Sequence, residues 1–191
     1  MAKWIFDRTM SLVGLLFLWP VLIIIAVAIK VTSVSEPVVY KQVRIGRFAK
    51  PFTIYKFRTM KTGHQGSTIS VKGESRITPI GEFLRKYKLD ELLELWNVLI
   101  GDMSFVGPRP DVPGYADKLE GDSRKILELR PGITGPASIK YKNEEQLLAK
   151  VSNPIEYNNE VIYPDKVKIN LDYYENHTLI GDIKLIIKTF V

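Results

Sequence analysis

A run without charged residues extends from Thr9 to Ile29, between Arg8 and Lys30. As a helix, its 21 residues would rise about 1.5 Å each and just cross a hydrocarbon core of roughly 30 Å. On length alone, this pattern predicts an ordinary membrane-spanning helix. Pro20 lies near the midpoint, however, where proline removes a backbone donor and biases Trp19 away from helical geometry. We therefore expect a helix that breaks at Trp19-Pro20.

Basic residues flank the apolar run on both sides. Residues 1–61 carry ten Lys or Arg and two acids, whereas the remaining residues carry 17 basic and 19 acidic side chains. The positive-inside rule normally produces an asymmetry, but here both flanks favour the cytoplasm. Basic residues beside an inserted segment also attract anionic membrane lipid. We expect residues 1–33 to form a re-entrant, helix-break-helix segment that enters and leaves through the cytoplasmic face.

Two other interpretations of this segment stay open. A spanning helix satisfies the length, and Ala26-Val27-Ala28 imitates a signal-peptidase site. Against a signal peptide, the run exceeds the roughly 7–15 residues of an h-region, and Asp7 does not suit a basic n-region. Nucleic acid is a rival partner for the positive charge, but the basic residues flank an apolar run and no nucleic-acid motif occurs. The pattern favours a membrane and no nucleic acid.

After the apolar run, the pattern first becomes strand-like. Residues 37–44 and 52–57 are β-prone, and the turn-like residues 46–51 separate them, which predicts a hairpin. The polar, glycine-bearing residues 62–75 predict a surface loop. Further along, Pro131-Gly132 and Gly135-Pro136 predict a rigid loop.

Helical patterns occupy most of the second half. Thr78-Pro79 predicts a helix start, with Phe83, Leu84 and Tyr87 directed inward. A second helix is predicted from about Asp90 to Leu99, because its apolar residues follow one face. Further helices are predicted over residues 115–120, over 123–129, over 144–151 with an Asn143/Gln146 capping box, and from Pro164 to about 175.

The C-terminal pattern is an apolar stripe with two lysines off it. Its members are Leu179, Ile180, Ile183, Ile186, Ile187 and Phe190, with Lys184 and Lys188 beside them. The stripe suits either core packing or an interfacial position on a membrane. The predicted fold class is α-rich α+β: the membrane segment, then a mostly helical cytoplasmic domain over residues 34–191 with a small hairpin and amphipathic interfacial helices.

Composition narrows the possible functions. A chain of 191 residues with 46% hydrophobic and 25% charged residues is typical of one folded domain and not of disorder. The absence of cysteine excludes disulfides, thiolate metal sites and a cysteine nucleophile. The motifs of P-loop, dinucleotide-fold and zincin enzymes are also missing from the sequence.

Adjacent carboxylates, Asp90 and Glu91, begin the second predicted helix. An aspartate there is either a helix cap or a functional group. Exposed N–H groups and the helix dipole would hold Asp90 ionised, as a nucleophile or metal ligand requires. The two side chains would diverge by about 100°, flank one substrate and titrate as a coupled pair. We interpret Glu94, one turn later, as a solvated surface residue.

Several basic residues are candidates for phosphate binding. Arg109 lies between two prolines, which would display its planar fork from a stiff turn, although a plain surface arginine is the alternative. Arg85 either converges with Asp90 on the same anion or pairs with Glu82. For Lys56 and Arg58, on one face of a predicted strand, and for Arg130, phosphate and solvent both remain possible. Asp172 faces either the site or solvent.

Four motifs occur in a particular order along the chain. They are KFRTM at residues 56–60, LDEL at 89–92, NVLIGDMSFVGPRP at 97–110 and RPGITG at 130–135. Together with QVRIG at residues 42–46, they resemble the bacterial sugar transferase family, whose members are small monotopic phosphoglycosyl transferases. The resemblance covers nearly the whole chain, which looks like a minimal form without an added N-terminal domain.

The resemblance implies an activity. It implies transfer of a phospho-sugar from a UDP-sugar to polyprenol (undecaprenyl) phosphate, with release of UMP, at the cytoplasmic face of the bacterial inner membrane. Carried over by position, Asp90 is the nucleophile and Mg²⁺ ligand, Glu91 its acid/base partner, and Arg85 and Arg109 bind phosphate. The alternative function is a non-enzymatic membrane scaffold that binds anionic lipid through its basic N-terminal third.

This chain departs from the family in two places. Trp19-Pro20 stands where many members have Ser-Pro, and residues 136–140 (PASIK) stand where members carry Leu-Ala-Gln. The second departure leaves the sugar pocket, and hence the sugar, unspecified.

Overall fold

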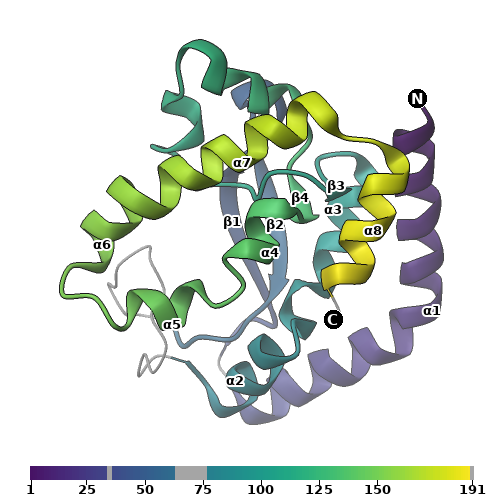
Figure 1. Cartoon of the computed structure of the whole chain (residues 1–191). Coiled ribbons are helices and arrows are strands. Elements are labelled where there is room, and N and C mark those ends of the chain that lie inside the picture. The colour runs from purple at the N-terminus through teal and green to yellow at the C-terminus, as the bar shows by residue number, and fades with distance from the viewer. Residues whose placement is uncertain (34–35, 63–76, 190–191) are drawn as a thin grey trace.

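The computed structural model describes residues 1–33, 36–62 and 77–189 (Figure 1). Helix α1 (Ala2–Thr32) is continuous through Pro20, and Figure 1 shows that it bends along its length. The predicted break at Trp19-Pro20 is therefore wrong, because both residues are helical. Proline removes one backbone hydrogen bond, which can kink a helix without ending it.

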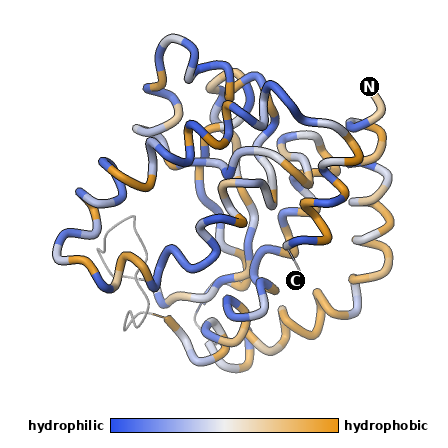
Figure 2. The backbone as a smooth tube through the Cα atoms, in the orientation of Figure 1, coloured by the Kyte–Doolittle hydropathy of each residue, from blue (hydrophilic) through white to orange (hydrophobic). Residues whose placement is uncertain are grey.

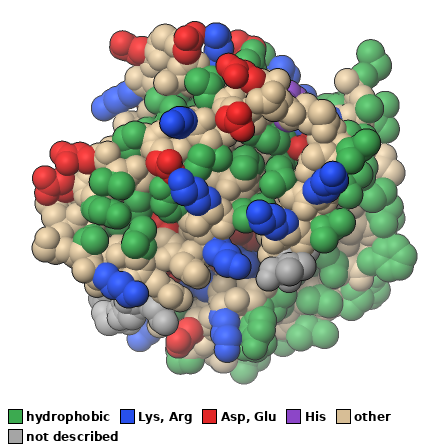
Figure 3. Space-filling view, viewed as in Figure 1, with side chains coloured by type: hydrophobic (Ala, Val, Ile, Leu, Met, Phe, Trp, Pro, Cys, Tyr) green, Lys and Arg blue, Asp and Glu red, His purple; other side chains and the backbone are tan. Residues whose placement is uncertain are grey.

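Among the described residues, α1 alone is long and apolar enough to cross a membrane. Figure 2 shows hydrophobic residues along most of it, and Figure 3 shows apolar side chains gathered at the edge that it forms. Both of its halves nevertheless contact the rest of the protein. Asp7 and Ser11 are buried near its start, and Ile25 and Ile29 pack near its end in a core cluster with Phe57 and Leu84.

The predicted hairpin is confirmed. Strands β1 (Val39–Ile45) and β2 (Pro51–Phe57) pair antiparallel, with Val39 opposite Phe57 and Ile45 opposite Pro51. In this register Lys56 lies opposite Tyr40, so Lys56 shares one face of the hairpin with Gln42 and Arg44. The loop predicted over residues 62–75 lies almost wholly outside the described residues.

A second strand pair was not predicted. Strands β3 (Ser104–Val106) and β4 (Gly132–Thr134) pair in parallel. Strand β4 lies where the sequence indicated only a rigid loop, and no element was predicted for β3. Strands of three residues are too short to show an alternating pattern. A Cβ at Gly132 would lie 2.2 Å from the backbone nitrogen of Gly107, so the close approach of the two segments requires glycine.

Short helices make up the remainder of the described fold (Figure 1). They are the 3₁₀ helix η1 (Arg47–Ala49) between the two hairpin strands, α2 (Pro79–Lys86), the 3₁₀ helix η2 (Leu89–Leu93), α3 (Glu94–Ile100), the 3₁₀ helices η3 (Ala116–Lys118) and η4 (Gly121–Glu128), α4 (Pro136–Lys140), α5 (Glu144–Leu148), α6 (Pro154–Tyr157), the π-helical turn η5 (Asn158–Ile162), α7 (Tyr163–Asn176) and α8 (Leu179–Thr189). The prediction of a mostly helical protein with a small sheet component is confirmed.

Two local predictions about these helices are wrong. Thr78 caps α2 as expected, but Phe83 and Tyr87 are exposed and stack on each other, while only Leu84 points inward. Asn143 makes no side-chain cap at α5. The helix expected from Pro164 to about residue 175 is confirmed as α7, with Pro164 in its first turn, and the π-helical turn η5 joins it to α6.

Helix α8 resolves the choice left open for the C-terminal stripe. Ile180, Ile183 and Ile187 are all exposed, so this part of the stripe does not pack in the core. Figure 1 places α8 beside the first half of α1. Exposed apolar residues on neighbouring helices are typical of a surface that meets a membrane or a partner.

Candidate active site

The acidic pair lies in a tight turn and not at the start of an α-helix. Lys88 has a left-handed backbone (φ 57°), and Asp90 and Glu91 follow it in η2, each with 9% of its surface exposed. The helix predicted from Asp90 to Leu99 is thus split, because α3 begins only at Glu94. This turn buries both carboxylates against β2.

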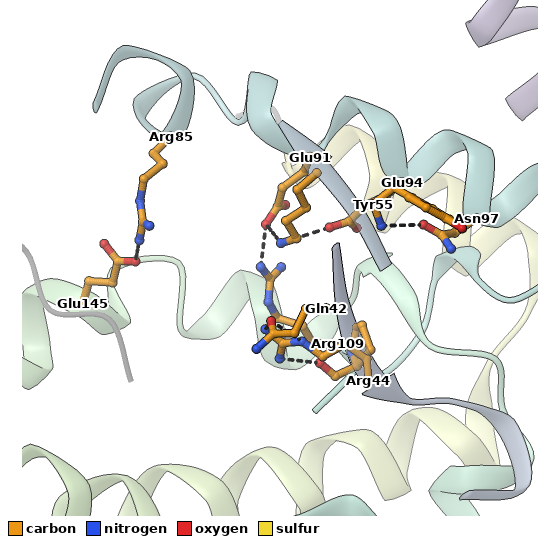
Figure 4. A network of polar contacts seen from close by, with 11 residues as sticks. Gln42, Arg44, Tyr55, Arg85, Glu91, Glu94, Asn97, Arg109 and Glu145 are labelled. Carbon is orange, nitrogen blue, oxygen red and sulfur yellow. Dashed lines mark hydrogen bonds and ion pairs between the residues drawn. The ribbon is translucent and has the colours of Figure 1, made fainter. Parts of the chain in front are cut away.

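Two cations hold Glu91. Its Oε1 lies 2.8 Å from Lys56 Nζ and 2.5 Å from an Arg109 guanidinium nitrogen (Figure 4). Burial alone would raise the pKa of the Glu91 carboxyl. The charges of Arg109 and Lys56 outweigh burial and hold that pKa well below its usual range. Glu91 is therefore ionised in the free protein.

The pKa of the Asp90 carboxyl moves in the opposite direction from that of Glu91. Its Oδ1 is buried without a hydrogen-bond partner. Burial, and then the charge of Glu91, raise the pKa of the Asp90 carboxyl, although Lys56, Lys88 and Arg85 oppose the change. The α-helix start that was expected to favour the ionised form of Asp90 is absent, because α3 begins only at Glu94. The pKa values of the two neighbouring carboxyls therefore move in opposite directions, with Glu91 as the more acidic member.

Glu94 belongs to the same cluster. We interpreted it as a solvated residue, but it is only 1% exposed and its Oε1 lies 3.0 Å from Lys56 Nζ. Burial raises the pKa of Glu94 more than Lys56 lowers it. The split between η2 and α3 turns Glu94 toward the hairpin, which no helical periodicity indicates. We call Lys56, Asp90, Glu91, Glu94 and Arg109 the acidic centre.

Arg109 forms the open side of the acidic centre. Its side chain is 43% exposed, and Glu91 raises its pKa further above the usual range. The turn that carries it is held from behind, because Arg44 donates to the carbonyl oxygen of Pro110 at 3.1 Å and to Gln42 Oε1 at 3.0 and 2.7 Å (Figure 4). Sequence reasoning missed Arg44 and Gln42. Their alternation on β1, on the face that also carries Lys56, was the available signal.

Arg85 lies at the edge of this region. Its guanidinium pairs with Glu145 of α5 and not with Glu82 (Figure 4). It is still close enough to favour the ionised form of Asp90. A diphosphate at the acidic centre would compete with Glu145 for this arginine.

The structure does not bring three other candidates to the acidic centre. Arg58 donates to the carbonyl oxygen of Pro37 and lies over the Tyr40 ring. Arg130 donates to the carbonyl oxygen of Gly101 at 3.0 Å. Asp172 is exposed on α7 and accepts from Asn176. These contacts support local structure.

The residues present suit a magnesium ion shared with a substrate. Among the described residues, no group of three or more His, Cys, Asp or Glu side chains forms a ready metal site. Mg²⁺ commonly binds one or two carboxylates together with water and substrate phosphates. The unpartnered Oδ1 of Asp90 would supply one such oxygen, and water and a bound phosphate would supply the others.

Comparison with known proteins places the chain in a family. Residues 1–191, the whole sequence, match the family model described as bacterial sugar transferase. The chain belongs to the bacterial sugar transferase family.

Curated relatives in this family carry specific names. The UDP-glucose:undecaprenyl-phosphate glucose-1-phosphate transferase of Xanthomonas campestris pv. campestris is 35% identical over 100% of this chain and 38% of its own length. The undecaprenyl-phosphate galactose phosphotransferase of Salmonella typhimurium is 34% identical over 96% of this chain and 38% of its own length. The uncharacterized sugar transferase EpsL of Bacillus subtilis is 34% identical over 98% of this chain and 84% of its own length. The chain thus spans little more than a third of the two longer relatives.

Proposed function

We propose that this protein transfers a phospho-sugar from a UDP-sugar to a polyprenol phosphate such as undecaprenyl phosphate and releases UMP. Such a transfer begins the synthesis of a bacterial glycoconjugate. The observation that carries the proposal is a buried acid pair, Asp90-Glu91, beneath the cations of Lys56 and Arg109. Cations at that position match a diphosphate, and two of the curated relatives, those of Xanthomonas campestris and Salmonella typhimurium, are named for transfer to undecaprenyl phosphate.

The proposed reaction has two displacements. A carboxylate oxygen of Asp90 attacks the sugar-linked phosphorus, and the bond from that phosphorus to the bridging oxygen breaks, so that UMP leaves with the oxygen and the electron pair. An oxygen of the lipid phosphate then attacks the same phosphorus and breaks the bond to Asp90, which restores the carboxylate. Splitting one displacement into two lets a small site meet a soluble donor and a lipid acceptor in turn.

Each residue of the acidic centre has a role in this scheme. Arg109, which is partly exposed, exchanges Glu91 for a donor phosphate. Lys56 holds Glu91 and Glu94 beside Asp90. Once Arg109 has left Glu91 for the donor phosphate, Glu91 loses a charge that lowers its pKa, and it receives the proton of the lipid phosphate. Mg²⁺ bound through Asp90 Oδ1 would neutralise the diphosphate and favour the ionised form of Asp90.

The scheme places the protein on the cytoplasmic face of the bacterial inner membrane, with α1 as a re-entrant helix. As one straight helix, the 31 residues of α1 would measure about 46 Å, and a straight spanning helix would carry one of its ends to the far side of the membrane. Here Lys3 near one end pairs with Asp182, and Ile29 near the other packs in the core. Both ends of α1 thus contact the same body, which supports re-entry.

Cysteine labelling tests this topology. Single cysteines at Lys3 and Lys41 are expected to react equally with an impermeant thiol reagent applied from the cytoplasmic side of inverted vesicles. Labelling of the two positions from opposite faces would show a spanning helix and contradict re-entry.

The catalytic proposal is tested by intact-protein mass. After incubation with Mg²⁺ and each of a panel of UDP-sugars, without lipid acceptor, we expect one phospho-sugar to be added to the wild-type protein and none to the Asp90→Asn variant. The accepted UDP-sugar identifies the sugar, and addition of polyprenol phosphate should discharge the adduct with ping-pong kinetics.

Two results would contradict the proposal at different levels. Turnover without an adduct, with intersecting double-reciprocal plots, would favour direct attack by the lipid phosphate. No release of UMP from any UDP-sugar would favour the non-enzymatic scaffold instead.

A further inference from the structure

A second buried polar cluster connects the beginning of α1 with the segment before Arg109. Asp7 is buried, and its Oδ2 accepts from the Ser104 hydroxyl at 2.8 Å while its Oδ1 accepts from the backbone N–H of Phe105 at 3.4 Å. Four residues earlier, Lys3 Nζ lies 2.5 Å from Oδ2 of Asp182 on α8. The first two turns of α1 are therefore bound to β3 and α8 through charged groups.

Both connections reach the same carbonyl. The oxygen of Val106 lies 3.1 Å from the Ser104 hydroxyl, which also contacts Asp7. It lies 3.3 Å from the Tyr173 hydroxyl, which also contacts Asp182 at 2.5 Å. The proton of the Ser104 hydroxyl is shared between this carbonyl and Asp7 of α1. The proton of the Tyr173 hydroxyl is shared between the same carbonyl and Asp182, which pairs with Lys3 of α1. We call Lys3, Asp7, Ser104, Tyr173 and Asp182 the α1 brace.

Val106 is the last residue of β3, three positions before Arg109. The intervening backbone has little freedom. The N–H of Gly107 donates to Thr134 at 2.9 Å, and the carbonyl oxygen of Pro108 accepts from Gly132 at 2.8 Å. A Cβ at Gly107 would lie only 2.3 Å from the carbonyl oxygen of Arg130. A displacement of Val106 would thus be transmitted along a stiff segment to Arg109.

We propose that the α1 brace positions Arg109. The position of the membrane helix α1 on the rest of the protein then sets the geometry of the phosphate-binding arginine. Asp7, Ser104 and Tyr173 are positioning residues in this scheme and touch no substrate. The inference rests on the proposed function only in giving Arg109 a donor phosphate to bind. The connection between α1 and residues 104–109 can be measured separately from activity, by deuterium exchange of the backbone amides.

The test uses the full chain in lipid nanodiscs and a matched pair of variants. Tyr173→Phe removes the hydroxyl that reaches Val106, whereas Tyr174→Phe removes its neighbour's hydroxyl, which contacts Glu128. Loss of a hydrogen bond should speed deuterium exchange at the backbone amides of residues 104–107 and 109 about threefold to tenfold in Tyr173→Phe and leave it unchanged in Tyr174→Phe. Ser104→Ala, from the other connection, should behave like Tyr173→Phe.

Kinetics then distinguish positioning from general stability. Tyr173→Phe should lower kcat/KM for the UDP-sugar about threefold to tenfold, but by less than twofold when Arg109 is already lysine, because one contact cannot be lost twice. Equal losses in both backgrounds, or unchanged exchange in both Tyr173→Phe and Ser104→Ala, would overturn the proposal. If the wild-type protein gives no transfer, the proposed function fails, and the exchange comparison alone decides the structural connection.

Discussion

The acidic centre and the α1 brace are both largely buried clusters of charged side chains, to which the brace adds two hydroxyls, but they differ in how completely their atoms are paired. In the brace, both oxygens of Asp7 and both oxygens of Asp182 have partners. In the centre, Asp90 Oδ1 has none, and Arg109 lies half in solvent. Buried polar groups are normally satisfied, so an unpaired oxygen beside a movable cation indicates chemistry, whereas a complete network indicates structure.

The largest loss of activity is expected from a substitution at Asp90. Asp90→Asn should lower transfer by at least about a thousandfold, because an amide is neither anionic nor a useful nucleophile. Its free energy of unfolding should change by no more than about 1 kcal/mol, since the carboxylate has an unpartnered oxygen and is repelled by Glu91. UMP release and denaturant unfolding measure the two effects. An Asp90→Asn protein that is inactive because it is unfolded would show that Asp90 stabilises the fold and does not take part in the chemistry.

Arg109 gives the next largest effect. Arg109→Lys keeps the charge but loses the planar two-point contact, which should cost about 1.5–3 kcal/mol, or roughly tenfold to a hundredfold in kcat/KM. Arg124→Lys is the control, because Arg124 is exposed and, within the part of the chain that the structure describes, donates to the backbone carbonyls of Asp117 and Leu119. Near-normal kcat/KM in a folded Arg109→Lys variant would show that Arg109 is a surface residue without a role in donor binding.

Asp182 should show the reverse pattern from Asp90. Asp182→Asn weakens bonds from Lys3 and Tyr173 in a buried position and should lower the free energy of unfolding by about 1.5–3 kcal/mol. Asp172→Asn, an exposed aspartate ten residues earlier, should change it by no more than about 0.5 kcal/mol. Denaturant unfolding of both proteins in the same detergent makes the comparison. Equal stability of the two variants would show that the brace is not a stabilising network.

The smallest effect concerns Arg85. Glu145→Gln frees its guanidinium, so KM for the UDP-sugar should fall by about twofold to fivefold, the range expected for an exposed ion pair. Glu144→Gln is the matched control, since Glu144 pairs with Lys166 instead. A KM that is the same in both variants would exclude Arg85 from donor binding.

Local signals in the sequence were sufficient for several elements. The β-prone runs gave the hairpin, Thr78-Pro79 gave the start of α2, and the uncharged run gave a helix of membrane length. The family motifs also gave the candidates Asp90, Glu91 and Arg109, which the structure brings together. Each of these depends on neighbouring residues or on a motif, so no long-range packing had to be known.

Other features depended on distant contacts. The split after η2 buries Glu94 against Lys56, 38 positions away, and no helical periodicity reports a partner on a strand. Strands β3 and β4 pair across residues 107–131 and have only three residues each. Proline predicted a break in α1, but one lost hydrogen bond does not end a helix that is packed against the protein at both ends.

The sequence by itself determined the family, the apolar segment with its basic flanks, and the identity of the acid pair. Only the tertiary structure decided which carboxyl of that pair is the more acidic, because the pKa of each depends on burial and on charges from β2 and the Arg109 turn. The tertiary structure also decided that Asp7, inside an apolar helix, contacts the segment that leads to Arg109. A burial penalty and a hydrogen bond between residues about 100 positions apart exist only once the chain has folded.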